Sequence, residues 1–215
     1  MSAAEKKLEL VTSERLKPST VLRLPFFESD AAIVAALRAR QAAGGAALYD
    51  RYHHYVRRML MRVLGPDADL ADLVQDVFVA AIDSIDSLEE PDALRGWLAG
   101  ICVNAARVEI RRKTRRRWFP LFSAQDLPEV EAPAATPELD EAVRTTYRVL
   151  KKLSAEERIA FALRFVDGME LVEVADACGV SLATAKRRLA RARKKFLTIA
   201  GTYPELSEWV AGGEA

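Results

Sequence analysis

In residues 169–196, MELVEVADACGVSLATAKRRLARARKKF, a short helical pattern and a longer one flank a single glycine. Gly179 predicts a sharp turn, because glycine adopts backbone conformations that other residues avoid. The small Ala175 permits a close crossing of the two helices, and Ser181 is placed to cap the second. The second helix is expected to bury one face, made of Leu182, Ala185, Leu189, Ala192 and Phe196. The stretch therefore predicts a helix-turn-helix.

The other side of that second helix is strongly basic. Between Lys186 and Lys195 there are seven lysine or arginine residues and no acidic residue. A solvated helix in an ordinary bundle is the alternative interpretation, but such helices usually mix charges of both signs. The single sign favours DNA binding, with early residues at base edges and later ones at phosphates.

Helical spacing extends over nearly the whole chain, and strand signals are nearly absent. Further helices are expected at 30–43 (ended by Gly44–Gly45), 46–64 (ended by Gly65–Pro66), 67–85, 92–116, 137–153 and 154–166. A stretch with four prolines and several acids, about 120–137, separates two helical sets. We therefore predict an all-α fold with two small helical domains joined by a flexible linker, the second containing the helix-turn-helix.

The predicted boundaries follow from this division. They are an N-terminal extension at 1–28, a first domain at 29–119, the linker at 120–137, a second domain at 138–200 and a tail at 201–215. We expect the tail to be a frayed end, with docking back on a domain as the alternative.

Charge is sorted into blocks, although the net charge is only +1. Nine acidic residues and no basic ones lie between Asp67 and Asp92, and seven basic residues against one acid lie between Arg107 and Arg117. Basic residues interleaved with Trp97, Trp118 and Phe119 suit single-stranded nucleic acid, although Trp97 fits a core position equally well. The blocks indicate surfaces meant for different partners.

Several function classes are disfavoured. No apolar run reaches the length of a membrane span and no signal-peptide core is present, so we expect a cytoplasmic protein without membrane contact. Two isolated cysteines, Cys102 and Cys178, and the adjacent His53 and His54 fit neither a disulfide framework nor a metal site. Without a glycine-rich phosphate loop or a nucleophile–base pair, we expect no enzyme and no cofactor.

Three strings resemble a known family. DLADLVQDVFVAAI, at 69–82, resembles region 2.2 of bacterial sigma factors, which binds the coiled coil of the largest RNA polymerase subunit. LRGWLAGICVNAARVEIRRK, at 94–113, resembles the following regions, which open and read the minus-ten promoter element. The segment 150–196 is similar to region 4 almost position for position. With its length and short linker, the chain resembles the extracytoplasmic-function (ECF) group of the sigma-70 family over about 30–197.

The resemblance implies three sets of site residues. The polymerase-binding set is Asp72, Leu73, Gln75, Asp76 and Phe78, of which Leu73 and Phe78 also lie on an apolar stripe and so favour core support. The minus-ten set is Asn104, Arg107, Arg111 and Arg112, and the loop 84–92 is implied to receive a flipped-out base. The minus-thirty-five set is Ser181, Thr184, Lys186, Arg187, Arg188 and Arg191. Leu94 and Val108 depart from the residues usual in the family at these positions, and both departures concern how the minus-ten element is read.

The implied function is promoter-specific transcription initiation without a catalytic step. The implied partners are core RNA polymerase, through its largest-subunit coiled coil and flap region, and promoter DNA; the group commonly also uses an anti-sigma factor. The free protein is expected to be a monomer. The alternative is a helix-turn-helix regulator that does not carry polymerase, and the acidic helix at 67–85 favours the sigma factor, because a plain regulator has no need of it.

Overall fold

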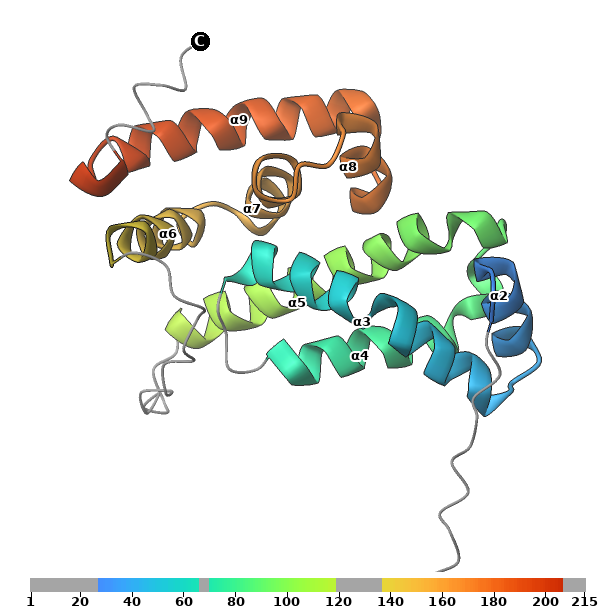
Figure 1. Cartoon of the computed structure of the whole chain (residues 1–215). Coiled ribbons are helices and arrows are strands. Elements are labelled where there is room, and N and C mark those ends of the chain that lie inside the picture. Colours follow the sequence, from blue (N-terminus) through green and yellow to red (C-terminus); the bar gives the residue numbers. More distant parts are fainter. Residues whose placement is uncertain (1–26, 66–69, 119–136, 207–215) are drawn as a thin grey trace, which may run out of the picture.

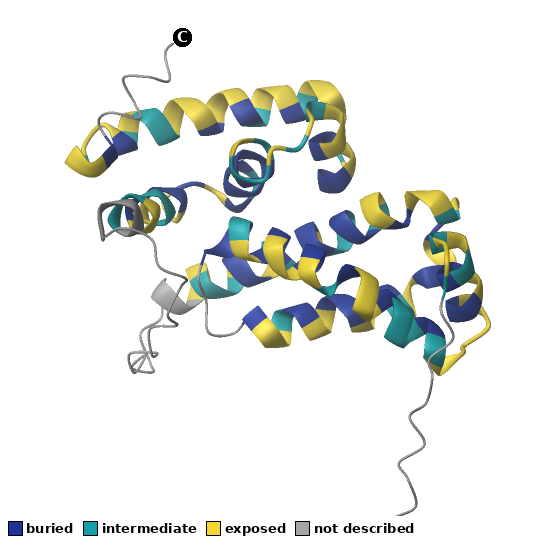
Figure 2. Ribbon diagram, viewed as in Figure 1, coloured by how far each residue is buried: buried dark blue, intermediate teal, exposed yellow. Residues whose placement is uncertain are grey.

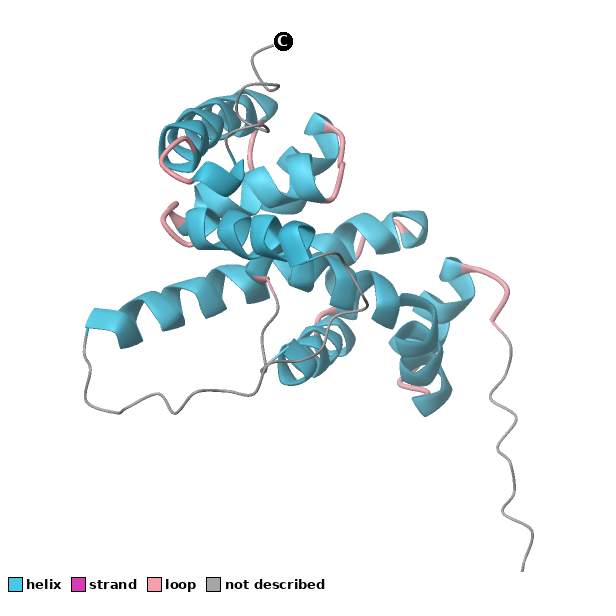
Figure 3. Cartoon of the chain, turned by 60° about the vertical axis from the view of Figure 1, so that its left-hand side comes forward, coloured by secondary structure: helices cyan, strands magenta, loops and turns pink. Residues whose placement is uncertain are grey.

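The computed structural model of the chain describes residues 27–65, 70–118 and 137–206. Nearly all of the predicted N-terminal extension, the predicted linker except Pro137, and the tail after Leu206 lie outside these ranges. Within them every regular element is a helix and none is a strand (Figures 1 and 3). The all-α prediction is confirmed.

Two helical units make up the described chain. The first unit contains α2 (Asp30–Arg38), α3 (Ala42–Leu64), α4 (Leu70–Asp83), the short 3-10 turns η1 (Ile85–Ser87) and η2 (Pro91–Ala93), and α5 (Leu94–Trp118). The second unit contains α6 (Pro137–Leu150), α7 (Ala155–Phe161), the π turn η3 (Ala162–Val166), α8 (Leu171–Cys178), α9 (Leu182–Ala200) and the 3-10 turn η4 (Pro204–Leu206). Figure 1 shows α6–α9 gathered on one side of α3 and α5.

The first helix boundary differs from the prediction. The expected stop at Gly44–Gly45 is wrong, because α2 already ends at Arg38 and both glycines lie inside α3. The turn between the helices contains Arg40 at φ +55°. A Cβ atom on Gly44 would lie 2.9 Å from the backbone nitrogen of Leu37. Here glycine serves the close approach of two helices rather than helix termination.

Other local predictions are confirmed. α3 ends before Gly65, which has φ +78°. The Ser154 hydroxyl accepts from the Glu157 backbone N–H while the Glu157 carboxylate accepts from the Ser154 N–H, so the predicted capping box begins α7. The apolar stripe of α4 is also present, with Val74, Val77 and Ala81 buried.

One apolar cluster joins the two units. It contains buried residues of the first unit, such as Val56 and Leu98, together with Ile159, Leu163 and Val174 of the second. In Figure 2 buried residues of α3 and α5 face those of α7 and α8. The second unit therefore packs directly on the first.

The start of the tail docks on the second unit. Leu206 is 4% exposed and packs with Val149 of α6 and Ala200 of α9. Tyr203 packs against the same cluster, and its hydroxyl accepts a hydrogen bond from Lys152 at 2.9 Å. For these residues the frayed end expected from the sequence is wrong, because an apolar groove between α6 and α9 receives them.

Candidate nucleic-acid interface

The turn between α8 and α9 has the predicted geometry. Gly179 adopts the left-handed conformation, with φ +64° and ψ +42°, and ends α8. The Val180 backbone N–H donates to the Ala175 carbonyl at 3.0 Å, and the Ser181 hydroxyl accepts from the Thr184 backbone N–H at 3.3 Å. A left-handed glycine followed by a serine cap turns the chain sharply, so α9 begins directly beside α8.

The buried face of α9 matches the prediction with one exception. Ala185, Leu189 and Ala192 are buried, and the Phe196 ring stacks on Phe161 with centroids 4.5 Å apart. Leu182, expected in the core, is 41% exposed, so that prediction is wrong. Its neighbours Ser181 and Ala183 are exposed as well, so the start of α9 is largely uncovered. Periodicity alone does not reveal where along a helix the apolar face stops being covered.

The outer face of α9 is a basic surface. Lys186, Arg187 and Arg191 are exposed, while Thr184 and Arg188 are partly exposed. Among the described residues, no carboxylate lies within ion-pair distance of Lys186, Arg187, Arg188 or Arg191; Lys195, further along, pairs with Glu157 at 2.9 Å. These unpaired cations make a surface that suits a DNA phosphate backbone.

A second basic surface lies on α5, and its cations are paired with acids. Arg111 contacts Glu156 of α7 at 2.8 Å and Arg107 contacts the same carboxylate at 3.8 Å. Arg112 pairs with Glu109 at 2.7 Å, and the Asn104 side-chain oxygen accepts a hydrogen bond from Arg107. The four predicted minus-ten residues thus lie along one stretch of α5, close to the second unit.

The charge environment of Glu156 follows from these contacts. Burial disfavours its charged form, but backbone N–H donation and the two arginines outweigh that effect and lower the pKa of Glu156 from its usual value. The ionised carboxylate is therefore held between α7 and α5.

α4 presents the acidic face expected for a protein partner. Asp72, Gln75 and Asp76 are exposed. Leu73 is half-buried against the core, and Phe78 is buried with its ring 4.9 Å from that of Tyr49. Phe78 thus lies in the core and Leu73 packs against it, whereas the exposed side chains of α4 form a polar, acidic surface.

Comparison with known proteins identifies the family. The Sigma-70 region 2 family model matches residues 48–116, and the Sigma-70, region 4 model matches residues 144–196. The RNA polymerase sigma factor NccH of Alcaligenes xylosoxydans xylosoxydans is 33% identical over 141 residues, which cover 62% of this chain and 74% of that relative. The ECF RNA polymerase sigma-E factor of Escherichia coli K12 is 28% identical over 153 residues, covering 67% and 80%.

The chain belongs to the ECF group of the sigma-70 family. As a sigma factor it directs transcription initiation. Two solved structures have a similar fold: CnrH in complex with the cytosolic domain of CnrY, and RpoE in complex with the anti-sigma factor NepR from Bartonella quintana. Both have a TM-score of 0.53, at 23% and 24% identity, and they cover 79% and 70% of this chain and 96% and 92% of their own.

In this sigma factor the loop that follows α4 is tied to the first unit. The Arg38 guanidinium donates to the Leu88 carbonyl, and Arg40 pairs with Asp86 at 2.9 Å. The Trp97 indole N–H donates to the Ser87 hydroxyl at 3.3 Å, and its ring is half-buried against the core. Trp97 therefore packs partly on the core and holds the loop through Ser87, and its use as a base platform stays a prediction.

The cysteines of this sigma factor are core residues. Both are free and buried, and burial raises the pKa of the Cys102 thiol to about 12. Burial also raises the pKa of Cys178. Thiolates are the reactive and metal-binding form, so the environment of both side chains disfavours that chemistry. In the described part of the chain, no three His, Cys, Asp or Glu residues are grouped to hold a metal ion, and no helix has the length and apolarity to cross a membrane.

Sequence reasoning missed the side chains that join the two units. Tyr147, Glu156 and Arg158 of the second unit all contact the first. Glu156 and Arg158 belong to a helix start whose capping signal explains their local role, and nothing in the sequence pattern pairs them with residues 45 to 95 positions earlier.

Proposed function

We propose that this sigma factor reads promoter DNA with α9 and α5 and binds core RNA polymerase with α4. The observation that carries the proposal is the basic face at the start of α9, which follows a tight left-handed turn. Among the described residues, no carboxylate lies within ion-pair distance of its Lys186, Arg187, Arg188 or Arg191. That arrangement is typical of a recognition helix in the major groove.

The α9 contacts divide between base edges and phosphates. Ser181, which caps α9, and Thr184 and Arg187, which lie three residues apart near its start, are assigned to base edges of the minus-thirty-five element. Lys186, Arg188 and Arg191 are assigned to phosphates. Arginine is suited to both tasks, because its planar fork binds guanine edges and phosphate oxygens with two hydrogen bonds.

The minus-ten element is assigned to α5 and to the loop 84–92. Asn104, Arg107, Arg111 and Arg112 supply polar and cationic groups along one helix. The exposed residues of this loop are assigned to an unstacked base. Flipping a base costs a few kcal/mol, which pocket contacts and stacking can offset.

The polymerase surface is assigned to Asp72, Gln75 and Asp76, with Leu73 and Phe78 holding α4 in place from the core side. The partner site is the coiled coil of the largest subunit, and the flap region receives the second unit. The similar structure of RpoE in complex with the anti-sigma factor NepR supports an anti-sigma partner for this chain as well.

The remaining assignments complete the proposal. The functional domains are residues 29–119 and 138–200, with 120–137 as linker. The protein is a monomer when free, works in the cytoplasm, and contributes binding and DNA opening without a catalytic step of its own.

Run-off transcription with purified core polymerase and a library of upstream sequences tests the proposal. The double charge reversal Asp72→Arg and Asp76→Arg is expected to lower polymerase affinity at least roughly tenfold, because charge complementarity is replaced by repulsion. Duplex DNA binding by the same variant is expected to persist. Reversals at exposed Glu28 and Glu205, away from α4, serve as the matched control.

The rival function is a DNA-binding regulator without polymerase. A chain that neither co-purifies with core polymerase nor starts transcripts, yet binds duplex DNA through α9, would favour the regulator. Equal loss of polymerase and DNA binding in the α4 variant would contradict the division of labour between α4 and α9.

A further inference from the structure

The second unit caps the end of α3. The last four carbonyls of a helix lack amide partners within the helix. In α3 these belong to residues 61–64. The Met61 carbonyl accepts from the Gly65 backbone N–H at 2.7 Å, and the Tyr147 hydroxyl lies 3.2 Å from the carbonyl oxygens of both Met61 and Arg62, so its one proton is available to the Arg62 carbonyl. The Arg158 guanidinium donates to the Val63 carbonyl at 2.9 Å and to the Leu64 carbonyl at 2.8 Å. Side chains from a distant part of the sequence thus satisfy the end of this helix.

Arg158 places a buried positive charge at the end of α3. Its side chain is buried, with 6% of its surface exposed, and none of the described carboxylates lies within ion-pair distance of it. Burial lowers the pKa of Arg158 to about 10, so it still carries its charge near pH 7. The negative end of the α3 dipole and two carbonyls stabilise that charge. Separating the units would leave these groups without their present partners.

Ion pairs join the units on either side of this capped end. Glu156 lies on Arg107 and Arg111 of α5, and Arg62 of α3 pairs with Asp167 after the π turn. The side chain of Arg107 is only 22% exposed. The carboxylate of Glu156 therefore occupies the position on two α5 arginines that an anionic group of DNA would take.

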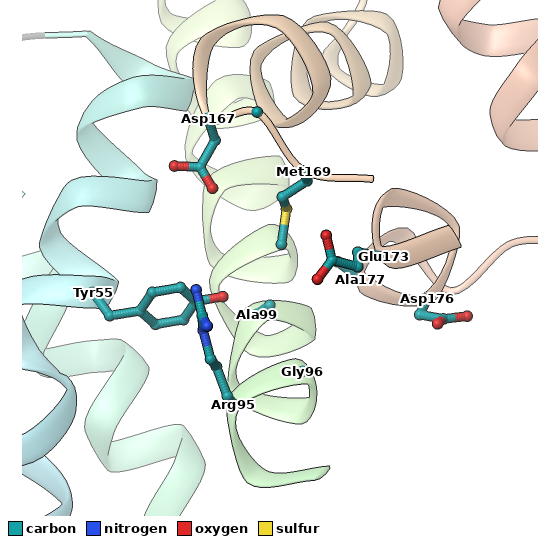
Figure 4. Close-up of a pocket in the computed structure, with 10 residues that line it drawn as sticks. Tyr55, Arg95, Gly96, Ala99, Asp167, Met169, Glu173, Asp176 and Ala177 are labelled. Atoms are coloured by element: carbon teal, nitrogen blue, oxygen red, sulfur yellow. The ribbon is translucent and has the colours of Figure 1, made fainter. Parts of the chain in front are cut away.

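A pocket lined by both polar and apolar residues lies beside these contacts (Figure 4). Its volume is about 270 Å³, and it lies between α3, α5, the segment before α8 and α8 itself, with a lining that includes Arg95, Asp167 and Glu173. The Arg95 guanidinium lies over the Tyr55 ring, 4.9 Å from its centroid. The apolar cluster that the two units share must also be broken when they separate, so opening requires more than the loss of the ion pairs.

We propose that the free protein rests in this closed form and that Glu156 competes with DNA for Arg107 and Arg111. The inference rests on the proposed role of these arginines in minus-ten binding. In the closed form the basic face of α9 remains exposed, whereas α5 is partly covered. Engagement of the minus-ten strand then requires the second unit to leave α3 and α5.

Single-stranded DNA binding by the full chain, without polymerase, tests the competition. The probe is a 5′-labelled single-stranded oligodeoxynucleotide of mixed sequence, followed by fluorescence anisotropy. Glu156→Gln is expected to bind about two- to fivefold more tightly than wild type, the range for one partly exposed ion pair. Glu141→Gln, which removes an acid that pairs with Arg148 within α6, is the matched control and is expected to bind as wild type does.

A double-mutant cycle separates competition from a general charge effect. In the background Arg107→Ala with Arg111→Ala, the change Glu156→Gln is expected to give no gain, because the competitor has lost its partners. A gain of equal size in that background, or no gain in the wild-type background, would overturn the proposal.

Small-angle X-ray scattering tests the closed form independently of DNA and polymerase. The wild-type chain is expected to be compact, and the pair Tyr147→Phe with Glu156→Gln is expected to have a larger radius of gyration. A wild-type chain that is already extended overturns the closed form. These readouts do not depend on transcription, so failure of the run-off assay would count against the proposed function and leave the competition to its own tests.

Discussion

α5 and α9 carry similar runs of lysine and arginine, but they present them differently. On α9, Lys186, Arg187 and Arg191 are exposed and lack a carboxylate partner among the described residues. On α5, Arg107 and Arg111 lie on Glu156, and Arg112 lies on Glu109. The comparison teaches that a basic sequence does not by itself make an available basic surface. Availability depends on which acidic groups the fold brings to it.

The largest expected effect is a loss of duplex DNA affinity when the exposed arginines of α9 are removed. Arg187→Ala with Arg191→Ala is expected to lower the affinity of the free chain for a selected promoter duplex roughly 100-fold, since a base contact and a phosphate contact are lost together. Arg107→Ala with Arg111→Ala is expected to change duplex affinity less than about threefold, because the intramolecular pair already occupies those side chains. Electrophoretic mobility shift at fixed salt measures both. Similar losses in the two double variants would contradict the difference between the helices.

An intermediate effect concerns the contact between Arg158 of α7 and the end of α3. Arg158→Gln removes the guanidinium that serves the Val63 and Leu64 carbonyls, and we expect a loss of about 2 kcal/mol from unsatisfied buried groups. For a chain of this size the melting temperature should fall by about 4–8 °C in calorimetry. Arg57→Gln, an exposed arginine of α3, should stay within about 2 °C of wild type. An Arg158 variant as stable as the control would mean that the cap contributes nothing.

The smallest expected effect is a pH dependence within the second unit. Burial opposes ionisation of Glu157, but hydrogen bonds from Lys195 and Ser154 outweigh it and lower the pKa of Glu157 below its usual 4.5. A lowered carboxyl pKa stabilises the fold above the unfolded value, and that stability is lost as the pH falls from about 4.5 through the folded pKa. Glu157→Gln should therefore cost about 0.5 kcal/mol at pH 7 and progressively less below pH 4.5.

Thermal melts of wild type and Glu157→Gln between pH 3 and pH 7 measure this effect. Glu141→Gln, at the more exposed pair with Arg148, is the control. A difference between wild type and Glu157→Gln that stays constant over the whole range would show that the ion pair with Lys195 does not stabilise the fold.

The sequence was sufficient where a local signal determines the structure. The Gly179 turn, the Ser154 capping box, the α4 stripe and the helix end at Gly65 were all predicted, because each depends on residues within one or two turns. The exposure of Asp72, Gln75 and Asp76 follows from the same helical periodicity. Family resemblance then supplied the roles of these residues.

The sequence predictions are wrong where contacts with a distant segment of the chain determine the structure. Gly44 lies inside α3 where α2 approaches it closely, and Leu182 is exposed although it belongs to the apolar stripe of α9. Leu206 is buried because it packs with Val149 of α6 and Ala200 of α9. The pairing of Glu156 with α5 and the cap on α3 join residues that no period or motif relates. Such contacts can be identified only from the three-dimensional arrangement of both units.

The cap on α3 also bears on the order in which the chain folds during synthesis. The carbonyls of residues 61–64 leave the ribosome well before Tyr147 and Arg158, which lie 85 to 95 positions further along. At ordinary translation rates of about 5–20 residues per second, the nascent first unit spends on the order of 5–20 s without its cap. The cationic helix α5 is uncovered for part of that interval, roughly 2–9 s at the same rates, because Arg111 precedes Glu156 by 45 positions. Closure is therefore a late step of biogenesis, completed only after the last unit of the chain has been made.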